Sequence, residues 1–264
     1  MNKYLLLFLF CAFCACSAFA QKTYFVVGLG YGLPSSQQSL FRRQNPQYPG
    51  FNGPNANQSI HGSYGAGLSL NTGFRHLTKN NWGWGIEMSY LLGRKIGSDI
   101  KTNFGDGFSQ VTLTSKSNAF FITPFVFKNF VTEGKVQPYV VAGLIVGAPK
   151  VVTDYTSLTD YDNSSTPDNK SHTTDETTHQ VRVGTKLAGG IDIKTGKKSA
   201  FFIELEVNIL SPWQKELKSS NGTTIAFEKE FDLATAQGNN QIADTTPFGS
   251  WGIRVGYRLP LEFK

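Results

Sequence analysis

Apolar and polar residues alternate over long stretches of this chain, most clearly near its C-terminus. Every odd position from Trp251 to Phe263 is apolar, whereas the even positions between them carry glycine, arginine, proline or glutamate. A period of two is typical of a β-strand with one apolar face. Helical periodicity is nearly absent from the rest of the chain, so the pattern predicts an all-β protein.

Eight stretches are predicted to form strands, at 23–33, 62–77, 82–93, 110–130, 136–152, 179–194, 200–210 and 249–264. The fourth and fifth stretches are apolar at both parities, which leaves the outward face open there. Short turns at 78–81, 132–135 and 195–198 alternate with long polar connections. In an up-and-down arrangement all short turns, and both ends of the domain, therefore lie at one end and all long loops at the other.

The second face of these strands is rich in glycine, for example at Gly28, Gly30, Gly85 and Gly252. Glycine weakens a strand face in water, but small residues suit the narrow interior of an eight-stranded barrel. We therefore expect an eight-stranded antiparallel up-and-down transmembrane β-barrel with its apolar face toward lipid. The alternative is a soluble lipocalin-type small-molecule binder, whose apolar face points inward.

Aromatic side chains near the strand ends of the apolar face predict a girdle at the membrane interfaces. Its members are Trp82, Trp84, Tyr90, Trp251, Tyr257 and Phe263.

Charged residues occupy the face that points into the predicted lumen. We expect a network there that contains Glu87, Arg182, Lys186, Glu204, Glu206, Arg254 and Arg258. Arg75 and Asp192 share the inward parity, and counting from the strand ends places Arg258 near the height of Glu204 and Glu206. Buried charges must pair, so the prediction is a plugged lumen, with a gated proton or ion path as the alternative.

The first 20 residues have the features of a secretory signal peptide that is cleaved after Ala20. A lysine precedes an apolar run, which ends at an Ala-x-Ala site. Cys11, Cys14 and Cys16 all lie in this segment, so we expect an exported barrel domain at 21–264 without disulfides. The formal charge of +6 is scattered along the chain, which argues against nucleic acid as a partner.

Three segments resemble one family of known proteins. They are GWGIEMSYLLG, VQPYVVAGLIVG at Val136–Gly147, and the closing WGIRVGYRLPLEF. They are similar to strands of outer-membrane β-barrels of the OmpA-like and opacity-protein type, and the last resembles the terminal signature that the barrel-assembly machinery recognises. The resemblance implies a cell outer membrane location and contact with that machinery, but no common activity.

Function is expected to lie in the long outer loops, where Arg42 and Arg43 are candidates to contact a partner or the phosphates of lipopolysaccharide. The predicted role is structural or surface-interaction, without enzymatic activity, cofactor or metal. Alternatives are an accessory component of a secretion machine and a lipid A modifying enzyme that uses His61 and Ser63. The acidic stretch from Asp154 to Thr178 is expected to be a solvated loop, with weak divalent cation binding as the alternative.

Overall fold

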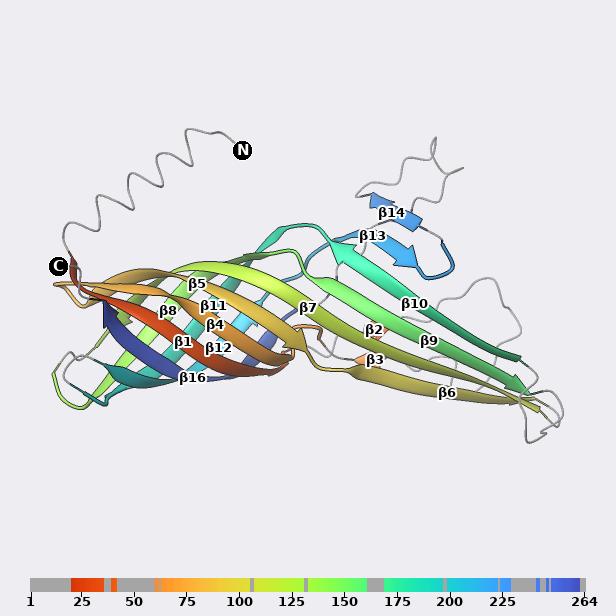
Figure 1. Ribbon diagram of the computed structural model, residues 1–264, viewed down its shortest axis with the longest axis horizontal. Helices are drawn as coiled ribbons and strands as arrows, with labels where there is room; N and C mark the ends of the chain where they lie inside the picture. Colours follow the sequence, from red (N-terminus) through yellow and green to blue (C-terminus); the bar gives the residue numbers. More distant parts are fainter. Residues whose placement is uncertain are drawn as a thin grey trace.

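In the computed structural model the described residues are 20–35, 39–41, 60–61, 63–104, 107–130, 133–160, 169–196, 199–222, 224–228, 241–242, 246 and 248–261. The elements in these ranges are β-strands (Figure 1). No helix of the described ranges is long and apolar enough to cross a bilayer. Residues 1–19 of the predicted signal peptide lie outside the described residues, as do Arg42, Arg43 and Phe263.

Eight strands form a closed antiparallel barrel, as predicted. In barrel order they are β1 (Ala20–Pro34), β4 (Gly67–Thr78), β5 (Trp82–Gly93), β7 (Gly107–Asn129), β8 (Val136–Gly147), β11 (Arg182–Lys194), β12 (Ala200–Ile209) and β16 (Ser250–Leu261). β16 closes the circle on β1, with Thr23 opposite Leu261 and Pro34 opposite Ser250. Closure pairs the backbone groups around the barrel wall, which a lipid environment requires.

The outer surface of the barrel is apolar and the interior is polar. Leu29, Val126, Leu205 and Ile253 have 49%, 50%, 61% and 52% of their surface exposed, although they are large hydrophobic residues. A lipocalin-type barrel has the opposite arrangement, with its apolar face around an internal ligand. The apolar surface is the one that a transmembrane barrel presents to lipid.

The structure shows which side chains face outward in the predicted strands at 110–130 and 136–152, which the sequence did not decide. Phe125 and Phe127 of β7 point inward and are almost fully buried, while Val126 between them points outward. In β8, Tyr139 points inward and Val140 outward. Large aromatic side chains therefore fill part of the lumen, which is why both parities of these strands look apolar in the sequence.

The barrel wall continues beyond the barrel as a flat sheet on one side (Figure 1). Its strands are β6 (Ile96–Phe104), the first half of β7, β9 (Lys150–Asp160) and β10 (Asn169–His179), in that order. Residues 107–117 of β7 alone extend about 35 Å, at about 3.3 Å per residue. We call β6, β9, β10 and residues 107–117 of β7 the outer sheet.

The outer sheet corrects the expectation of a solvated acidic loop at Asp154–Thr178. Most of this stretch forms the β9–β10 pair, with Asp154 opposite Thr174 and Thr156 opposite His172. Threonine favours strands, but the two faces are both polar, so the apolar alternation that marks the barrel strands is missing.

Shorter strands complete the end of the molecule that carries the outer sheet. They are β13 (Gln214–Ser219), β14 (Thr224–Glu228) and β15 (Gln241–Ile242), with β2 (Ser39–Phe41) paired to β3 (Ile60–His61). The predicted strand at 62–77 begins too early, because Tyr64 and Ala66 precede β4 and are buried. β4 begins only at Gly67, whose φ of 142° interrupts the alternation.

The short turns join barrel strands at the opposite end, which we call the turn end. Asn81 in the β4–β5 turn and Gly134 in the β7–β8 turn have positive φ angles of 63° and 92°. Asparagine and glycine tolerate this conformation best, which explains the turn composition that the sequence shows.

Candidate functional site

The lumen holds a cluster of eight charged side chains that we call the lumen network. Four are basic and four acidic, so their formal charges cancel: Arg75, Lys186, Arg254, Arg258, Glu87, Asp192, Glu204 and Glu206. Seven of them have at most 6% of their side-chain surface exposed, and Glu206 has 11%. Charges removed from water to this degree are stable only when they are paired.

Glu204 of β12 lies at the centre of the network. Its carboxylate accepts hydrogen bonds from Arg75 Nη2 at 3.0 Å, from the Tyr139 hydroxyl at 3.0 Å, and from Arg254. Arg254 lies opposite Glu204 in the strand register and also donates to Glu87. One guanidinium therefore connects carboxylates from β5 and β12 across the lumen.

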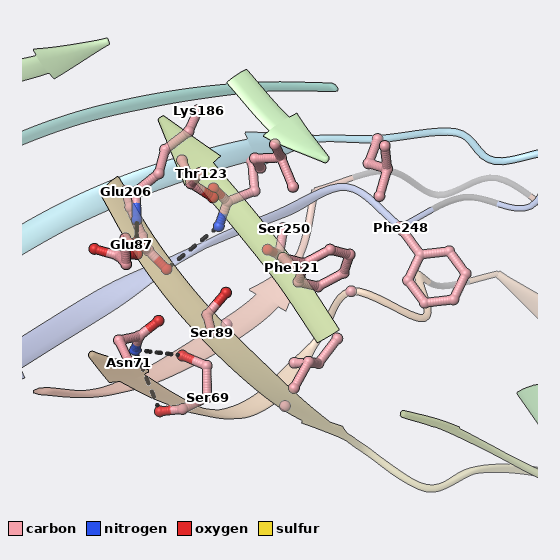
Figure 2. A pocket seen from close by; sticks show the side chains of 17 residues that line it. Ser69, Asn71, Glu87, Ser89, Phe121, Thr123, Lys186, Glu206, Phe248 and Ser250 are labelled. Atoms are coloured by element: carbon pink, nitrogen blue, oxygen red, sulfur yellow. Dashed lines mark hydrogen bonds and ion pairs between the residues drawn. The ribbon is translucent and has the colours of Figure 1, made fainter. Parts of the chain in front are cut away.

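Lys186 of β11 completes a second link. Its ammonium lies 2.9 Å from Glu87 Oε1 and 2.9 Å from Glu206 Oε2, so that one cation is shared between two carboxylates (Figure 2). Asn208 supports Glu206 through a hydrogen bond of 3.3 Å. The network thus joins strands from opposite sides of the barrel, and each of its carboxylates has a cationic partner.

Two placements differ from the sequence prediction. Arg258 pairs with Asp192 and not with Glu204 or Glu206. The stagger between strands places Arg254 at the height of Glu204, which counting residues from strand ends does not reveal. Arg182 lies outside the lumen network, at the outer end of β11, with its guanidinium 5.4 Å from the centre of the Trp213 ring.

Aromatic rings surround Arg75 on the turn-end side of the lumen. Its guanidinium carbon lies between 5.2 and 5.8 Å from the ring centres of four aromatic residues, which are Phe125, Phe127, Tyr139 and Phe202. Cation–π contacts of this kind are strongest where water is excluded. Arg258 also lies over Tyr139, at 4.6 Å. This aromatic layer fills the lumen between the ion pairs and the turn end.

Glycine provides the space for the large charged side chains. Six members of the lumen network lie opposite a glycine on a neighbouring strand: Arg75 and Gly85, Glu87 and Gly73, Lys186 and Gly143, Glu204 and Gly190, Glu206 and Gly252, Arg254 and Gly30. A Cβ at Gly85 would lie 2.4 Å from the Phe125 ring. The glycine-rich face of the sequence is therefore the lumen face.

A cavity lies on the outer side of the lumen network (Figure 2). Polar residues line its sides, and apolar residues line its outer end. The space between its walls amounts to about 570 Å³ when the part that is open to solvent is counted with it. Lys186 and Glu206 line its floor, while Leu91, Leu210 and Phe248 belong to a buried apolar cluster at its outer side. In addition to the aromatic layer around Arg75, ion pairs fill the middle of the lumen and apolar side chains pack at its outer mouth.

His179 contacts two other segments of the chain at this outer mouth of the lumen, one at Pro149 and one at Thr246 and Phe248. Its Nδ1 donates to the Pro149 carbonyl at 2.9 Å, and Nε2 lies 2.8 Å from Thr246 Oγ1. Its ring also packs edge-on against Phe248. Burial lowers the pKa of His179 to about 4, so the ring is neutral at pH 7 and Nε2 accepts the hydroxyl proton of Thr246.

The predicted girdle residues that the structure describes lie at two heights of the outer surface. Trp82, Trp84 and Tyr257 lie near the turn end, whereas Tyr90 and Trp251 lie near the outer end. Trp82, Tyr90 and Trp251 are exposed, whereas Trp84 is half-buried beside His76, with ring centres 4.8 Å apart. Exposed amphipathic rings in this position suit the two lipid–water boundaries.

The remaining candidates are not brought together as a site in the described ranges. Ser63 is 1% exposed, and its hydroxyl accepts a hydrogen bond from the Gly65 amide, so it is closed to a substrate. The side chain of His61 lies outside the described residues, as do Arg42 and Arg43. Within the described ranges, no group of three or more His, Cys, Asp or Glu side chains is arranged to hold a metal ion.

Sequence reasoning gave too little weight to Arg75 and Asp192 and did not find Tyr139 and Phe202. Arg75 and Asp192 alternate with residues of the apolar outer face, so their positions along the strands predict that both charges point into the lumen. Tyr139 lies in a stretch where both parities are apolar, so only the fold shows that its hydroxyl reaches Glu204.

Comparisons with known proteins give a distant likeness only. No protein-family model and no curated protein sequence matches the chain. Among solved structures, the chain is similar to the crystal structure of Ail, the attachment invasion locus protein of Yersinia pestis, in complex with the heparin analogue sucrose octasulfate. The two are 10% identical with a TM-score of 0.32, over 90% of this chain and 100% of the other. A likeness of this degree carries no information on activity.

Proposed function

We propose that this protein is an integral outer-membrane barrel with a closed lumen that holds the outer sheet at the cell surface for contact with a partner. The observation that carries this proposal is the continuity of the wall. β7 runs without a break from the barrel into the outer sheet, pairing with β5 at Phe120 and with β6 and β9 at Thr112. The barrel acts as the anchor and the sheet as the platform.

Two features support a structural role over transport or catalysis. Ion pairs cross the lumen and an apolar cluster covers them, which leaves no continuous wide path among the residues that the structure describes. The acidic and basic groups of the lumen network are paired with one another, so none is poised to act on a substrate. We infer that activity resides in binding at the outer surface.

The proposed partners follow from the same arrangement. The apolar belt is covered by outer-membrane lipid, and lipopolysaccharide borders the strands that lead into the outer sheet. The barrel-assembly machinery inserts the chain, and a protein partner of unknown identity binds the platform. Contact of Arg42 and Arg43 with lipopolysaccharide phosphates remains a prediction.

Membrane location and topology are tested together by surface labelling. The cysteine variants Ser171→Cys in β10 and Lys79→Cys in the β4–β5 turn both place a thiol at an exposed position. On intact cells a membrane-impermeant maleimide should label Ser171→Cys only, and permeabilisation should expose Lys79→Cys. The protein should fractionate with the outer membrane and migrate differently on gels before and after boiling. Labelling of Lys79→Cys on intact cells, or recovery in the soluble fraction, would contradict the proposal.

A further inference from the structure

Lysines surround the turn end of the barrel. Lys22, Lys79, Lys128, Lys135 and Lys194 come from β1, the β4–β5 turn, β7, the β7–β8 turn and β11, and we call them the lysine collar. They follow one another around most of the barrel circumference, and the Lys194 amide donates to the Lys135 carbonyl at 2.9 Å. Among the described residues of this end, Glu133 is the exposed carboxylate.

Two lysines at the outer end are paired with carboxylates, whereas three of the collar lysines are not. Lys150 lies 2.6 Å from Glu176, and Lys218 lies 3.4 Å from Glu216, so their charges are partly neutralised. In the part of the chain that the structure describes, no carboxylate lies within ion-pair distance of Lys22, Lys79 or Lys135, and all three are exposed. The collar therefore presents positive charge to its surroundings.

The collar borders the apolar belt directly. The Lys128 ammonium lies 4.8 Å from the centre of the Trp82 ring, and the two residues are opposite each other in the β5–β7 register. Trp82 is 52% exposed on the lipid side, and Phe130, directly after the end of β7, is 59% exposed. Tryptophan at this position marks the lipid–water boundary, so the lysines lie at the depth of the headgroups.

We propose that the lysine collar binds the phosphate groups of anionic phospholipids in the leaflet at the turn end. The inference rests on the proposed function, because it requires the barrel to span a membrane. Lysine ammonium groups at a membrane surface attract anionic headgroups, and each contributes a binding factor on the order of fivefold. Lys150 and Lys218 are paired with carboxylates, so they contribute less to such a preference.

Tryptophan quenching by brominated lipids tests the proposal, because the four tryptophans divide between the two ends. The variant Trp213→Phe/Trp251→Phe keeps Trp82 and Trp84, which report on the turn end. The full-length mature protein is reconstituted into vesicles of phosphatidylcholine mixed with phosphatidylglycerol, with one or the other lipid brominated. Both leaflets then have the same composition, so the orientation of insertion does not affect the result.

At low salt, brominated phosphatidylglycerol should quench these reporters more strongly than brominated phosphatidylcholine, with a relative association constant on the order of fivefold. Half-molar NaCl should reduce the ratio toward one by screening. The triple variant Lys22→Gln/Lys79→Gln/Lys135→Gln should also bring it close to one. A matched control, Lys150→Gln/Lys170→Gln/Lys218→Gln, removes the same charge at the outer end and should leave the ratio unchanged.

The outcomes separate the two proposals. Equal quenching by both lipids in the parent protein would overturn the lysine collar as a lipid site, while the barrel would still be membrane-embedded. An unchanged ratio in the collar variant would do the same. Absence of quenching by either lipid would show that Trp82 and Trp84 do not meet lipid, and the proposed function would fail as well.

Discussion

The substitution Glu204→Gln tests the lumen network at its centre. Glu204 has no exposed side-chain surface, and it is the carboxylate that lies within ion-pair distance of Arg75 in the described ranges. The substitution preserves shape but removes the charge, which leaves Arg75 buried without a carboxylate, whereas Arg254 keeps Glu87. Breaking a buried pair by removing one partner costs about 3–5 kcal/mol.

The expected loss in the free energy of unfolding is therefore about 4 kcal/mol, measured by reversible urea unfolding in vesicles with tryptophan fluorescence as the probe. Glu216→Gln is the matched control, since Glu216 pairs with Lys218 on the surface, and its cost should stay below about 1 kcal/mol. The double variant Glu204→Leu/Arg75→Leu removes both charges and should lie within about 1 kcal/mol of the parent. A loss below about 1 kcal/mol for Glu204→Gln would mean that water screens the lumen charges, and the reasoning from burial would fail.

Further predictions concern the ion pair of Arg258 with Asp192, the protonation of His179 at the outer mouth, and two glycines of the barrel wall. Arg258→Leu should cost about 3–5 kcal/mol in the same assay, because it leaves a buried aspartate unpaired; unchanged stability would refute its pairing. The folded pKa of His179 lies below its unfolded value, so the protein should lose stability as the pH falls from about 6.5 to about 4. The loss should reach about 3 kcal/mol and be absent in His179→Gln, and equal pH profiles of the two would contradict it. Gly85→Ala should destabilise by about 1–3 kcal/mol, because the new methyl group meets the Phe125 ring. Gly189→Ala, where the nearest atom lies 4.0 Å away, should be close to neutral, and equal effects at the two glycines would argue against a packed lumen.

The barrel could be predicted from the sequence because lipid and lumen impose opposite demands on alternate residues. β5 carries Trp82, Ile86 and Met88 outward and Glu87 inward, and the structure has the bounds that the alternation predicted. The turns were equally readable, since Asn81 and Gly134 are the residues with positive φ that tight turns require.

The outer sheet could not be predicted in the same way, because lipid does not mark either of its faces. Thr156 and Thr174 belong to strands that carry polar residues on both faces, so these strands show no alternation of apolar and polar residues. The partners within the lumen network were also out of reach. Strand stagger decides that Arg254 and not Arg258 lies beside Glu204, and stagger depends on barrel closure as a whole.

The central claim is that one wall passes from lipid into water, and β7 allows it to be tested along a single strand. Thr112, Thr114, Phe120, Ile122 and Val126 share the outward face of β7. Spin labels at these five positions, introduced through cysteine into the reconstituted mature protein, report collision with oxygen, which is enriched in lipid, and with a water-soluble nickel chelate. The account predicts nickel access at positions 112 and 114, and oxygen access with nickel exclusion at 120, 122 and 126. High nickel access at all five positions in vesicles would contradict it.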